Sequence, residues 1–187
     1  MRVIAGDLGG RDLACPKGKA VRPITGRVKG AVFNILGHRV GGAKVLDLYA
    51  GCGSFGIEAL SRGAAWVDFV EREAGHVRFL EGNLEALGLS PRAGVHVREV
   101  RAALAGLAGP VDLILADPPF SPDRKLLPPD VYEDLAALSA SPVWAPGGIL
   151  VLDHRGGRPL FPEAMGPWLG QQRDYGDATV SFFRKPG

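Results

Sequence analysis

Apolar and polar positions repeat along the chain with two different periods, and these periods predict strands that alternate with helices. From Lys44 onward, short apolar runs have the composition of buried strands, namely KVLDLYA, AAWVDFVE, GVHVRE, VDLIL and GGILVLDH. Between them, apolar residues recur three or four positions apart, as in Val77, Leu80, Leu84 and Leu87, which predicts amphipathic helices. The end of the chain, GQQRDYGDATVSFFRK, predicts two strands and a tight turn. This order is typical of an α/β fold with an open, mostly parallel, doubly wound sheet of seven strands that ends in an antiparallel hairpin.

The first forty residues have a different pattern. Two short apolar pieces, RVIAG and RDLACP, flank the glycine-rich turn DLGG and predict a small hairpin. Thr25 is a candidate N-cap, and the apolar spacing after it predicts a helix that ends at Gly37. These residues contain eight Lys or Arg and two Asp, whereas the rest of the chain has fourteen bases against eighteen acids. The charge indicates either a polyanion partner or a plain solvated surface, and it divides the chain into a basic extension (1–40) and a main domain (41–187).

Composition excludes several classes of protein. The chain has 187 residues, of which 46% are hydrophobic and 22% charged, with no apolar run long enough to span a membrane. Its first residues lack an apolar stretch followed by a small-residue cleavage site, so we expect no secretory signal. We therefore expect a cytoplasmic protein with no membrane partner. Separately, we expect the protein to be a monomer. Cys15 and Cys52 give neither a disulfide framework nor a metal-binding spacing, and four scattered histidines do not complete a metal site. We expect no metal, and we expect Cys52 to be a small buried residue.

A glycine-rich loop follows the first strand of the main domain. Gly51, Gly53 and Gly56 form a GxGxxG motif, in which glycines allow a tight turn and a close approach to a ligand. Glu71 ends the next strand twenty residues after Gly51, where it could hold the ribose of either NAD or S-adenosylmethionine. Asp47 lies inside the strand before the loop, and its charge favours the cationic S-adenosylmethionine over a pyrophosphate. The alternative for Asp47 is a carboxylate that only holds loop amides.

The fourth strand ends in the residues Asp117, Pro118, Pro119 and Phe120. Two consecutive prolines keep the backbone extended and without free amides, so the Pro118 carbonyl and the Asp117 carboxylate are both available as hydrogen-bond acceptors. An exocyclic amine on a nucleobase has two N–H groups that such a pair can hold, and Phe120 can stack on the base. The alternative is a strand stopped by proline beside a core phenylalanine.

These motifs resemble those of a known family. DLYAGCGSFGIEAL together with DPPF is similar to class I S-adenosylmethionine-dependent methyltransferases that methylate exocyclic amines. RVIAGDLGGRDLACPKG with VRPITGRVKGAVFNIL is similar to the N-terminus of RsmD-type 16S ribosomal RNA guanine-N2 methyltransferases, and the resemblance runs from Arg2 to about Asp153. It implies a Rossmann-like class I methyltransferase fold, S-adenosylmethionine as cofactor, and 16S rRNA within the small ribosomal subunit or an assembly intermediate as partner.

The resemblance also implies roles for particular residues, with the glycine loop on the methionine portion of the cofactor and Glu71 on its ribose. The cofactor residues that we expect are Asp47, Tyr49, Ala50, Gly51, Gly53, Glu71, Arg72 and Arg101. The residues that we expect to hold the target guanine are Asp117, Pro118, Pro119 and Phe120, and those for RNA phosphates are Arg11, Arg22, Arg27 and Lys29. The chain departs from the family at Gly26 and Gly30, where acids are usual, and in REVRA, where Glu99 or Arg101 replaces the usual Asp or Asn beside the adenine.

The expected reaction is transfer of a methyl group to the N2 amine of a guanine in 16S rRNA, with Asp117 accepting a hydrogen bond from that amine. Three other functions use similar residues: methylation of adenine N6 in DNA, methylation of a protein glutamine amide, and a non-catalytic RNA-binding module. An NAD-dependent dehydrogenase is disfavoured by Asp47.

Overall fold

The computed structural model describes residues 1–16, 25–119, 127–155, 165 and 168–187. Its strands are β1 (Lys44–Leu48), β2 (Trp66–Glu71), β3 (Ala93–Val97), β4 (Val111–Ala116), β5 (Trp144–Arg155), β6 (Leu169–Tyr175) and β7 (Ala178–Arg184). Its α-helices are α1 (Gly26–Leu36), α2 (Ser54–Ser61), α3 (Ala74–Ala86), α4 (Val100–Leu104) and α5 (Pro129–Ala140). Two short 3-10 helices cover Gly37–Arg39 and Ser90–Arg92.

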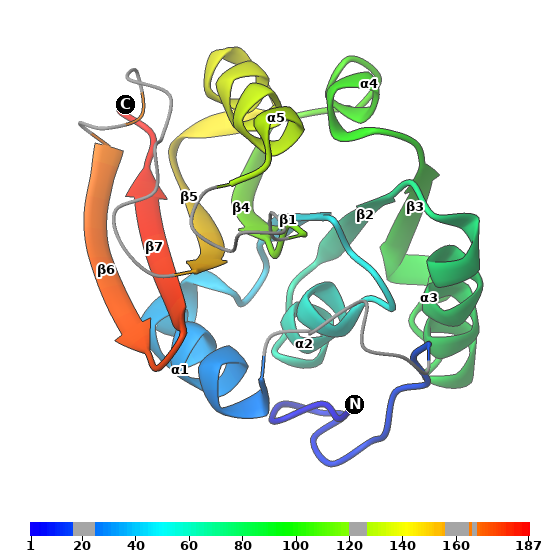
Figure 1. Cartoon of the computed structure of the whole chain (residues 1–187). Helices are drawn as coiled ribbons and strands as arrows, with labels where there is room; N and C mark the ends of the chain where they lie inside the picture. Colours follow the sequence, from blue (N-terminus) through cyan, green and yellow to red (C-terminus); the bar gives the residue numbers. More distant parts are fainter. Residues whose placement is uncertain (17–24, 120–126, 156–164, 166–167) are drawn as a thin grey trace.

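The strands form one sheet in the order β3-β2-β1-β4-β5-β7-β6 (Figure 1). The pairs from β3 through β2, β1 and β4 to β5 are all parallel. Strand β7 is antiparallel to both β5 and β6, and the turn between β6 and β7 is the short one that the sequence predicts. The predicted α/β fold with a mostly parallel sheet and an antiparallel end is confirmed.

Alternate residues of the central strands face two hydrophobic layers. Val45 and Leu113 belong to the core beneath α1, α2 and α3, whereas Leu46 and Ile114 belong to the core beneath α4 and α5. This two-residue period is the one that a strand imposes, because successive side chains point to opposite faces. Both faces are covered, which explains why the strand sequences are almost continuously apolar.

The N-terminal segment (residues 1–16) packs against the same core as α1 and α2. Val3 and Leu13 are buried there, and one antiparallel bridge joins Arg2 to Asp12, so the predicted hairpin is present as a single bridge. In Figure 1 the segment, in dark blue, passes below α2 towards the end of α3. The extension is therefore held to the main domain by a shared hydrophobic core.

Helix α1 begins where the sequence predicts. The Thr25 hydroxyl accepts a hydrogen bond from the Val28 amide at 3.4 Å, and the helix ends at Leu36, before Gly37. Gly37 has φ +54, a conformation that glycine adopts without strain. Within the described ranges, no helix is both long and apolar enough to cross a membrane.

Candidate active site

Three carboxylates come together where the central parallel strands end. Leu48 of β1 is paired with Val70 of β2 and with Ala116 of β4, so the residues that follow the latter two, Glu71 and Asp117, end neighbouring strands on either side of β1. Asp47, one position before Leu48, interacts electrostatically with both Glu71 and Asp117. In open α/β sheets ligands bind at this edge, and a cluster of negative charge there favours a cationic ligand.

Asp47 is the most buried of the three, at 1% exposed. Its Oδ2 accepts a hydrogen bond from the Gly56 amide in the first turns of α2, at 2.8 Å. Burial raises the pKa of Asp47 to about 8, and repulsion by Asp117 and Glu71 adds to this, whereas the Gly56 amide and the Lys29 ammonium oppose it. Asp47 therefore does hold a backbone amide, as the alternative interpretation has it, but a cation placed nearby would also relieve the repulsion among the carboxylates.

Glu71 connects the end of β2 to the glycine loop. One of its carboxylate oxygens accepts from the Gly51 amide at 2.8 Å, and the other accepts from the Glu73 amide at 2.8 Å. Each carboxylate oxygen has a second lone pair, so the side chain keeps the capacity to accept hydrogen bonds from a ligand hydroxyl. The predicted neighbourhood of Glu71 and the loop, twenty residues apart, is present in the fold.

Each glycine of the loop is required for a different physical reason. Gly51 and Gly53 have φ +57 and +83, which other residues adopt only with strain. A side chain on Gly53 would collide with Leu80, and one on Gly56 would collide with the Phe69 ring. A side chain on Gly51 would meet nothing within 4 Å, so open space lies beside this part of the backbone.

Cys52, between the two glycines, is joined to Cys15 by a disulfide, with their Cα atoms 5.5 Å apart. The expectation that the two cysteines give no disulfide framework is therefore wrong, whereas Cys52 is buried, as expected. The reason is that the cysteines are 37 residues apart, and only the path of the N-terminal segment past the loop brings them together. The carbonyl of Cys52 also accepts from the Asn83 amide group at 3.0 Å.

Asp117 and Pro118, which the sequence predicts as an acceptor pair, directly follow the fourth strand. Asp117 is partly buried, Pro118 is buried and Pro119 is exposed, and all three follow β4 without helix or strand structure. Phe120, the predicted stacking residue, lies outside the described residues. Asp117 and Pro118 are thus at the same edge as Asp47 and Glu71.

Tyr49 and Arg101, which the sequence predicts as cofactor residues, converge on a carboxylate of α5. The Tyr49 hydroxyl donates to Asp134 at 2.8 Å, and Arg101 of α4 lies 3.1 Å from the other oxygen of Asp134. Tyr49 has φ +58, which is rare for a residue with a side chain and common at functional sites. Burial raises the pKa of Asp134, and the hydrogen bond from Tyr49 and the charge of Arg101 oppose that rise.

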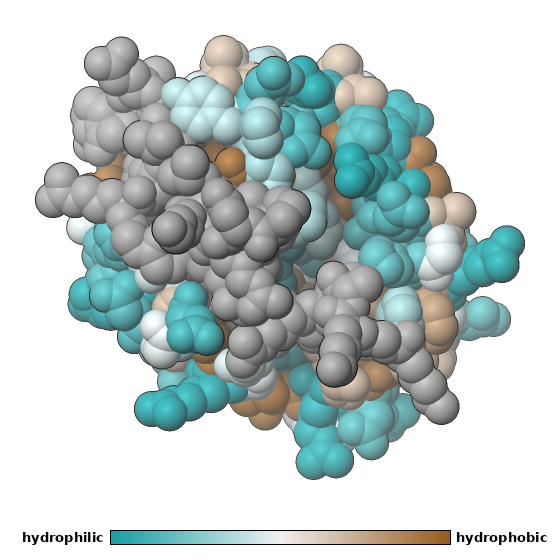
Figure 2. All heavy atoms as spheres, in the orientation of Figure 1, coloured by the Kyte–Doolittle hydropathy of each residue, from teal (hydrophilic) through white to brown (hydrophobic). Residues whose placement is uncertain are grey.

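Arg72, also predicted at the cofactor, forms exposed ion pairs with Glu99 at 3.5 Å and with Asp130 at 3.8 Å. Glu99 precedes α4, and Asp130 lies in the first turn of α5, so Arg72 joins the ends of β2, α4 and α5. Figure 2 shows a mainly hydrophilic surface over α4 and α5, consistent with these pairs. The site edge therefore carries both acidic and basic side chains.

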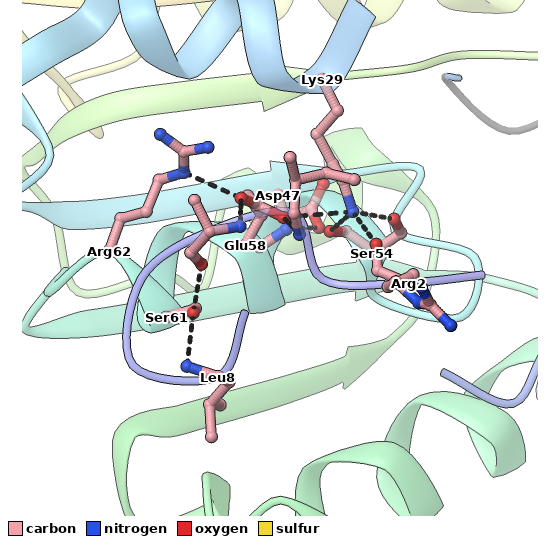
Figure 3. Close-up of polar contacts among 11 residues, drawn as sticks. Arg2, Leu8, Lys29, Asp47, Ser54, Glu58, Ser61 and Arg62 are labelled. Carbon is pink, nitrogen blue, oxygen red and sulfur yellow. Dashed lines mark hydrogen bonds and ion pairs between the residues drawn. The ribbon is translucent and has the colours of Figure 1, made fainter. Parts of the chain in front are cut away.

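Lys29, predicted as an RNA contact, is buried at 1% exposed. Its ammonium donates to the Ser54 hydroxyl at 2.9 Å and to the Arg2 carbonyl at 3.0 Å, and it lies 3.3 Å from a carboxylate oxygen of Glu58 (Figure 3). Burial lowers its pKa, and Glu58 opposes this. The prediction for Lys29 is wrong because the face of α1 that carries it packs onto α2, which leaves no surface for a phosphate. Arg11 and Arg27 are exposed, and Arg22 lies outside the described residues.

Three polar residues near the site were missed by the sequence analysis. Glu58 accepts from the Ile4 and Ala5 amides at 2.7 and 3.0 Å, and Asn83 both donates to and accepts from the backbone of Ala14 at 2.9 Å. Asp134, the third, holds Tyr49. Each stands among apolar positions of its helix, and an ionic or amide side chain on an apolar face is the signal that could have indicated a buried polar contact.

A cavity of about 470 Å³ lies at the opposite edge of the sheet, lined by residues such as Gly42, Asp112 and Arg184. None of the residues predicted to bind cofactor or substrate that lie in the described part of the chain lines it. The candidate active site is therefore assigned from the chemistry of the strand ends and not from this cavity.

Known proteins similar to this chain include methyltransferases. The family model described as "Conserved hypothetical protein 95" matches residues 1–184. The putative rRNA methyltransferase YlbH of Bacillus subtilis is 32% identical over 100% of both chains. Ribosomal RNA small subunit methyltransferase D of Escherichia coli K12 is 36% identical over 64% of this chain and 60% of its own length. The solved T. thermophilus 16S rRNA N2 G1207 methyltransferase (RsmC), in complex with AdoMet and guanosine, has a TM-score of 0.72 and 26% identity over 89% of this chain and 44% of its own.

Proposed function

The chain belongs to the family described as Conserved hypothetical protein 95, and from this premise we propose that it transfers a methyl group from S-adenosylmethionine to the exocyclic N2 amine of a guanine in 16S rRNA. At the coarser level it is a Rossmann-like rRNA methyltransferase that uses S-adenosylmethionine. The relatives named above support ribosomal RNA as the substrate class, and the RsmC complex supports the cofactor and the N2 amine of guanine. The single observation that carries the proposal is the group of Asp47, Glu71 and Asp117 at one edge of the sheet.

The cofactor would bind along the ends of β1 and β2. Asp47 and the backbone of Gly51 and Gly53 would lie at its cationic methionine portion, and Glu71 would accept hydrogen bonds from the ribose hydroxyls. Tyr49, Ala50, Arg72 and Arg101 complete the proposed set, because they flank the same strand ends. When bound, S-adenosylmethionine supplies an electrophilic methyl group on a positively charged sulfur that leaves as a neutral thioether.

The target amine would be held at the end of β4. The Asp117 carboxylate and the Pro118 carbonyl are acceptors for its two N–H groups, which aims the nitrogen lone pair at the methyl group. As the nitrogen forms its new bond to carbon it becomes positively charged, and the Asp117 carboxylate stabilises that charge and accepts the proton. Phe120 is proposed to stack on the base.

The basic extension is proposed to bind RNA through Arg11, Arg22 and Arg27. Arg11 and Arg27 are exposed and can therefore reach phosphates, whereas Lys29 is withdrawn from the set. Binding through phosphates weakens steeply with salt, so the Kd for RNA should rise as the salt concentration rises. The free energy needed to flip a guanine out of its stack is smaller in a single-stranded loop than in a duplex, and this favours a looped RNA target.

Transfer of labelled methyl groups would test the proposal. Small ribosomal subunits that lack the modification, free small-subunit RNA and duplex DNA would each be incubated with the protein and S-adenosylmethionine, and the products digested to nucleosides. We expect label in N2-methylguanosine from a ribosomal substrate. Label in N6-methyladenine from DNA, label in a protein amide, or binding without transfer would each overturn the proposed substrate in favour of one of the other functions.

An Asp117→Ala variant would test the role of the β4 end. We expect the Kd for S-adenosylmethionine to change much less than turnover, which should fall by a factor of at least about 100 because positioning and proton acceptance are both removed. Asp112→Asn is the matched control, since Asp112 lies on the same strand at the opposite edge of the sheet. Near-normal turnover by Asp117→Ala would refute the assignment.

A further inference from the structure

We propose that Lys29 is a positioning residue for the cofactor loop: it holds the first turn of α2 in the arrangement that binds S-adenosylmethionine, an inference that rests on the proposed function. Lys29 lies on α1, in the basic extension, and touches neither of the proposed ligands. Its role would be exerted through Ser54, the residue that follows Gly53 directly.

The contacts of Lys29 converge on the start of α2. Its ammonium donates to the Ser54 hydroxyl at 2.9 Å and to the Ser54 carbonyl at 3.3 Å. Figure 3 shows the side chain descending from α1 to a point between Ser54 and Glu58. The Arg2 carbonyl, at 3.0 Å, and Glu58, at 3.3 Å, complete its surroundings. A buried ammonium needs such partners, so the side chain is fixed in one place.

The first turn of α2 depends on these tertiary contacts. Its N-cap is Gly53, whose lack of a side chain leaves the helix without a capping hydrogen bond of its own. Asp47 holds the Gly56 amide, and Lys29 holds Ser54 from α1. The glycine loop directly before this turn has open space beside Gly51, and its backbone would face the cofactor. Loss of the Lys29 contact would allow this turn to shift and would weaken cofactor binding.

The same side chain also fastens the N-terminal segment. Lys29 holds the Arg2 carbonyl, and Glu58, its ionic partner, accepts from the Ile4 and Ala5 amides and from Arg62 at 2.8 Å. A lysine that served RNA directly would instead lie exposed beside Arg27. If Lys29 positions the cofactor loop, its loss weakens binding of S-adenosylmethionine, whereas if it contacts RNA directly, its loss weakens binding of RNA.

The test compares binding of S-adenosylmethionine and of RNA in the full-length chain. In a Lys29→Met variant we expect the Kd for S-adenosylmethionine, measured by titration calorimetry, to rise at least about fivefold, and the KM for small ribosomal subunits to stay within about twofold. Lys29→Arg keeps the charge but places a larger, planar guanidinium in a buried site, so it should restore only part of the affinity. Arg27→Met is the matched control on the same helix, and it should raise the KM for subunits without changing the Kd for S-adenosylmethionine.

A second variant keeps the test decisive if Lys29→Met does not fold. Ser54→Ala removes only the hydroxyl partner, and it should weaken cofactor binding in the same direction by a smaller factor, with circular dichroism and the melting temperature reporting an intact fold. A folded Lys29→Met with unchanged cofactor affinity, or an unchanged Ser54→Ala when Lys29→Met is unfolded, would overturn the role of Lys29 alone. Failure of the wild-type protein to bind S-adenosylmethionine would instead overturn the proposed function.

Discussion

Replacement of Asp47 by asparagine should stabilise the protein, and the gain should increase with pH. Asparagine has nearly the shape of a protonated aspartic acid, and its side-chain oxygen can still accept the hydrogen bond from the Gly56 amide, now 2.8 Å long. The substitution removes the charge that burial, Asp117 and Glu71 all disfavour at this position. It therefore isolates the energetic cost of the buried carboxylate.

The sign follows from the two protonation equilibria of Asp47. The unfolded chain releases this proton near the ordinary pKa of 3.8, whereas burial keeps it on the folded protein up to a pKa of about 8. Between these values the folded state binds more protons, so the wild type loses free energy of unfolding, relative to the variant, by about 1.4 kcal/mol per pH unit. The whole interval, from 3.8 to about 8, amounts to at most roughly 6 kcal/mol, and above it the difference is constant.

The assay is urea denaturation of wild type and Asp47→Asn at pH values from 5 to 9. Most other groups titrate alike in the two proteins, so their contributions cancel in the difference between the two free energies of unfolding. Asp112→Asn, which removes an exposed carboxylate on β4, is the control. Its free energy of unfolding should differ from that of the wild type by an amount that changes little over the same pH range. A difference for Asp47→Asn that stays constant from pH 5 to pH 8 would refute the reasoning.

Cofactor binding should depend on the same proton. A cationic ligand beside Asp47 favours the ionised carboxylate, so binding should release a proton, and the affinity of the wild type for S-adenosylmethionine should rise as the pH rises towards the Asp47 pKa of about 8. Asp47→Asn should bind more weakly at pH 8 and should not release this proton. Calorimetry in two buffers of different ionisation enthalpy measures the release, and equal values for both proteins would contradict the expectation.

Other substitutions test the packing around the site. Serine at both Cys15 and Cys52 should lower the free energy of unfolding by about 3–4 kcal/mol, because the disulfide closes a loop of 37 residues. A reductant should destabilise the wild type and leave the double variant unchanged. A thiol titration that finds two free thiols in the native wild type would contradict this. Gly82→Ala should stabilise the protein by about 0.5–1 kcal/mol, because Gly82 lies in α3 with open space around it, and a lower melting temperature would count against that. Gly6→Ala should destabilise the protein by more than about 2 kcal/mol, because Gly6 has φ +82 and the methyl group of alanine would collide with the Ser61 carbonyl. A melting temperature equal to that of the wild type would contradict this prediction.

Sequence patterns located the candidate site but did not define its surroundings. The glycine loop, Glu71 and the DPP residues could be placed at one edge because parallel strands bring their carboxyl ends together, and the register of β1, β2 and β4 does so. The hydrogen bonds of Asp134 and Asn83 could not be foreseen. Asn83 holds the backbone of Ala14, 69 residues earlier, and no local pattern records a contact over that distance.

The sequence by itself determined the order of strands and helices, the glycine loop, the acceptor pair after β4 and the resemblance to a methyltransferase family. Periodicity, turn residues and short motifs are local properties of the sequence, so they can be recognised without knowledge of the packing. Only the tertiary structure decided that Lys29 is buried against Glu58 and that Cys15 meets Cys52. Burial depends on which helix faces and chain segments pack together. The sequence of α1 does not show whether a basic side chain on it points to water or packs against α2.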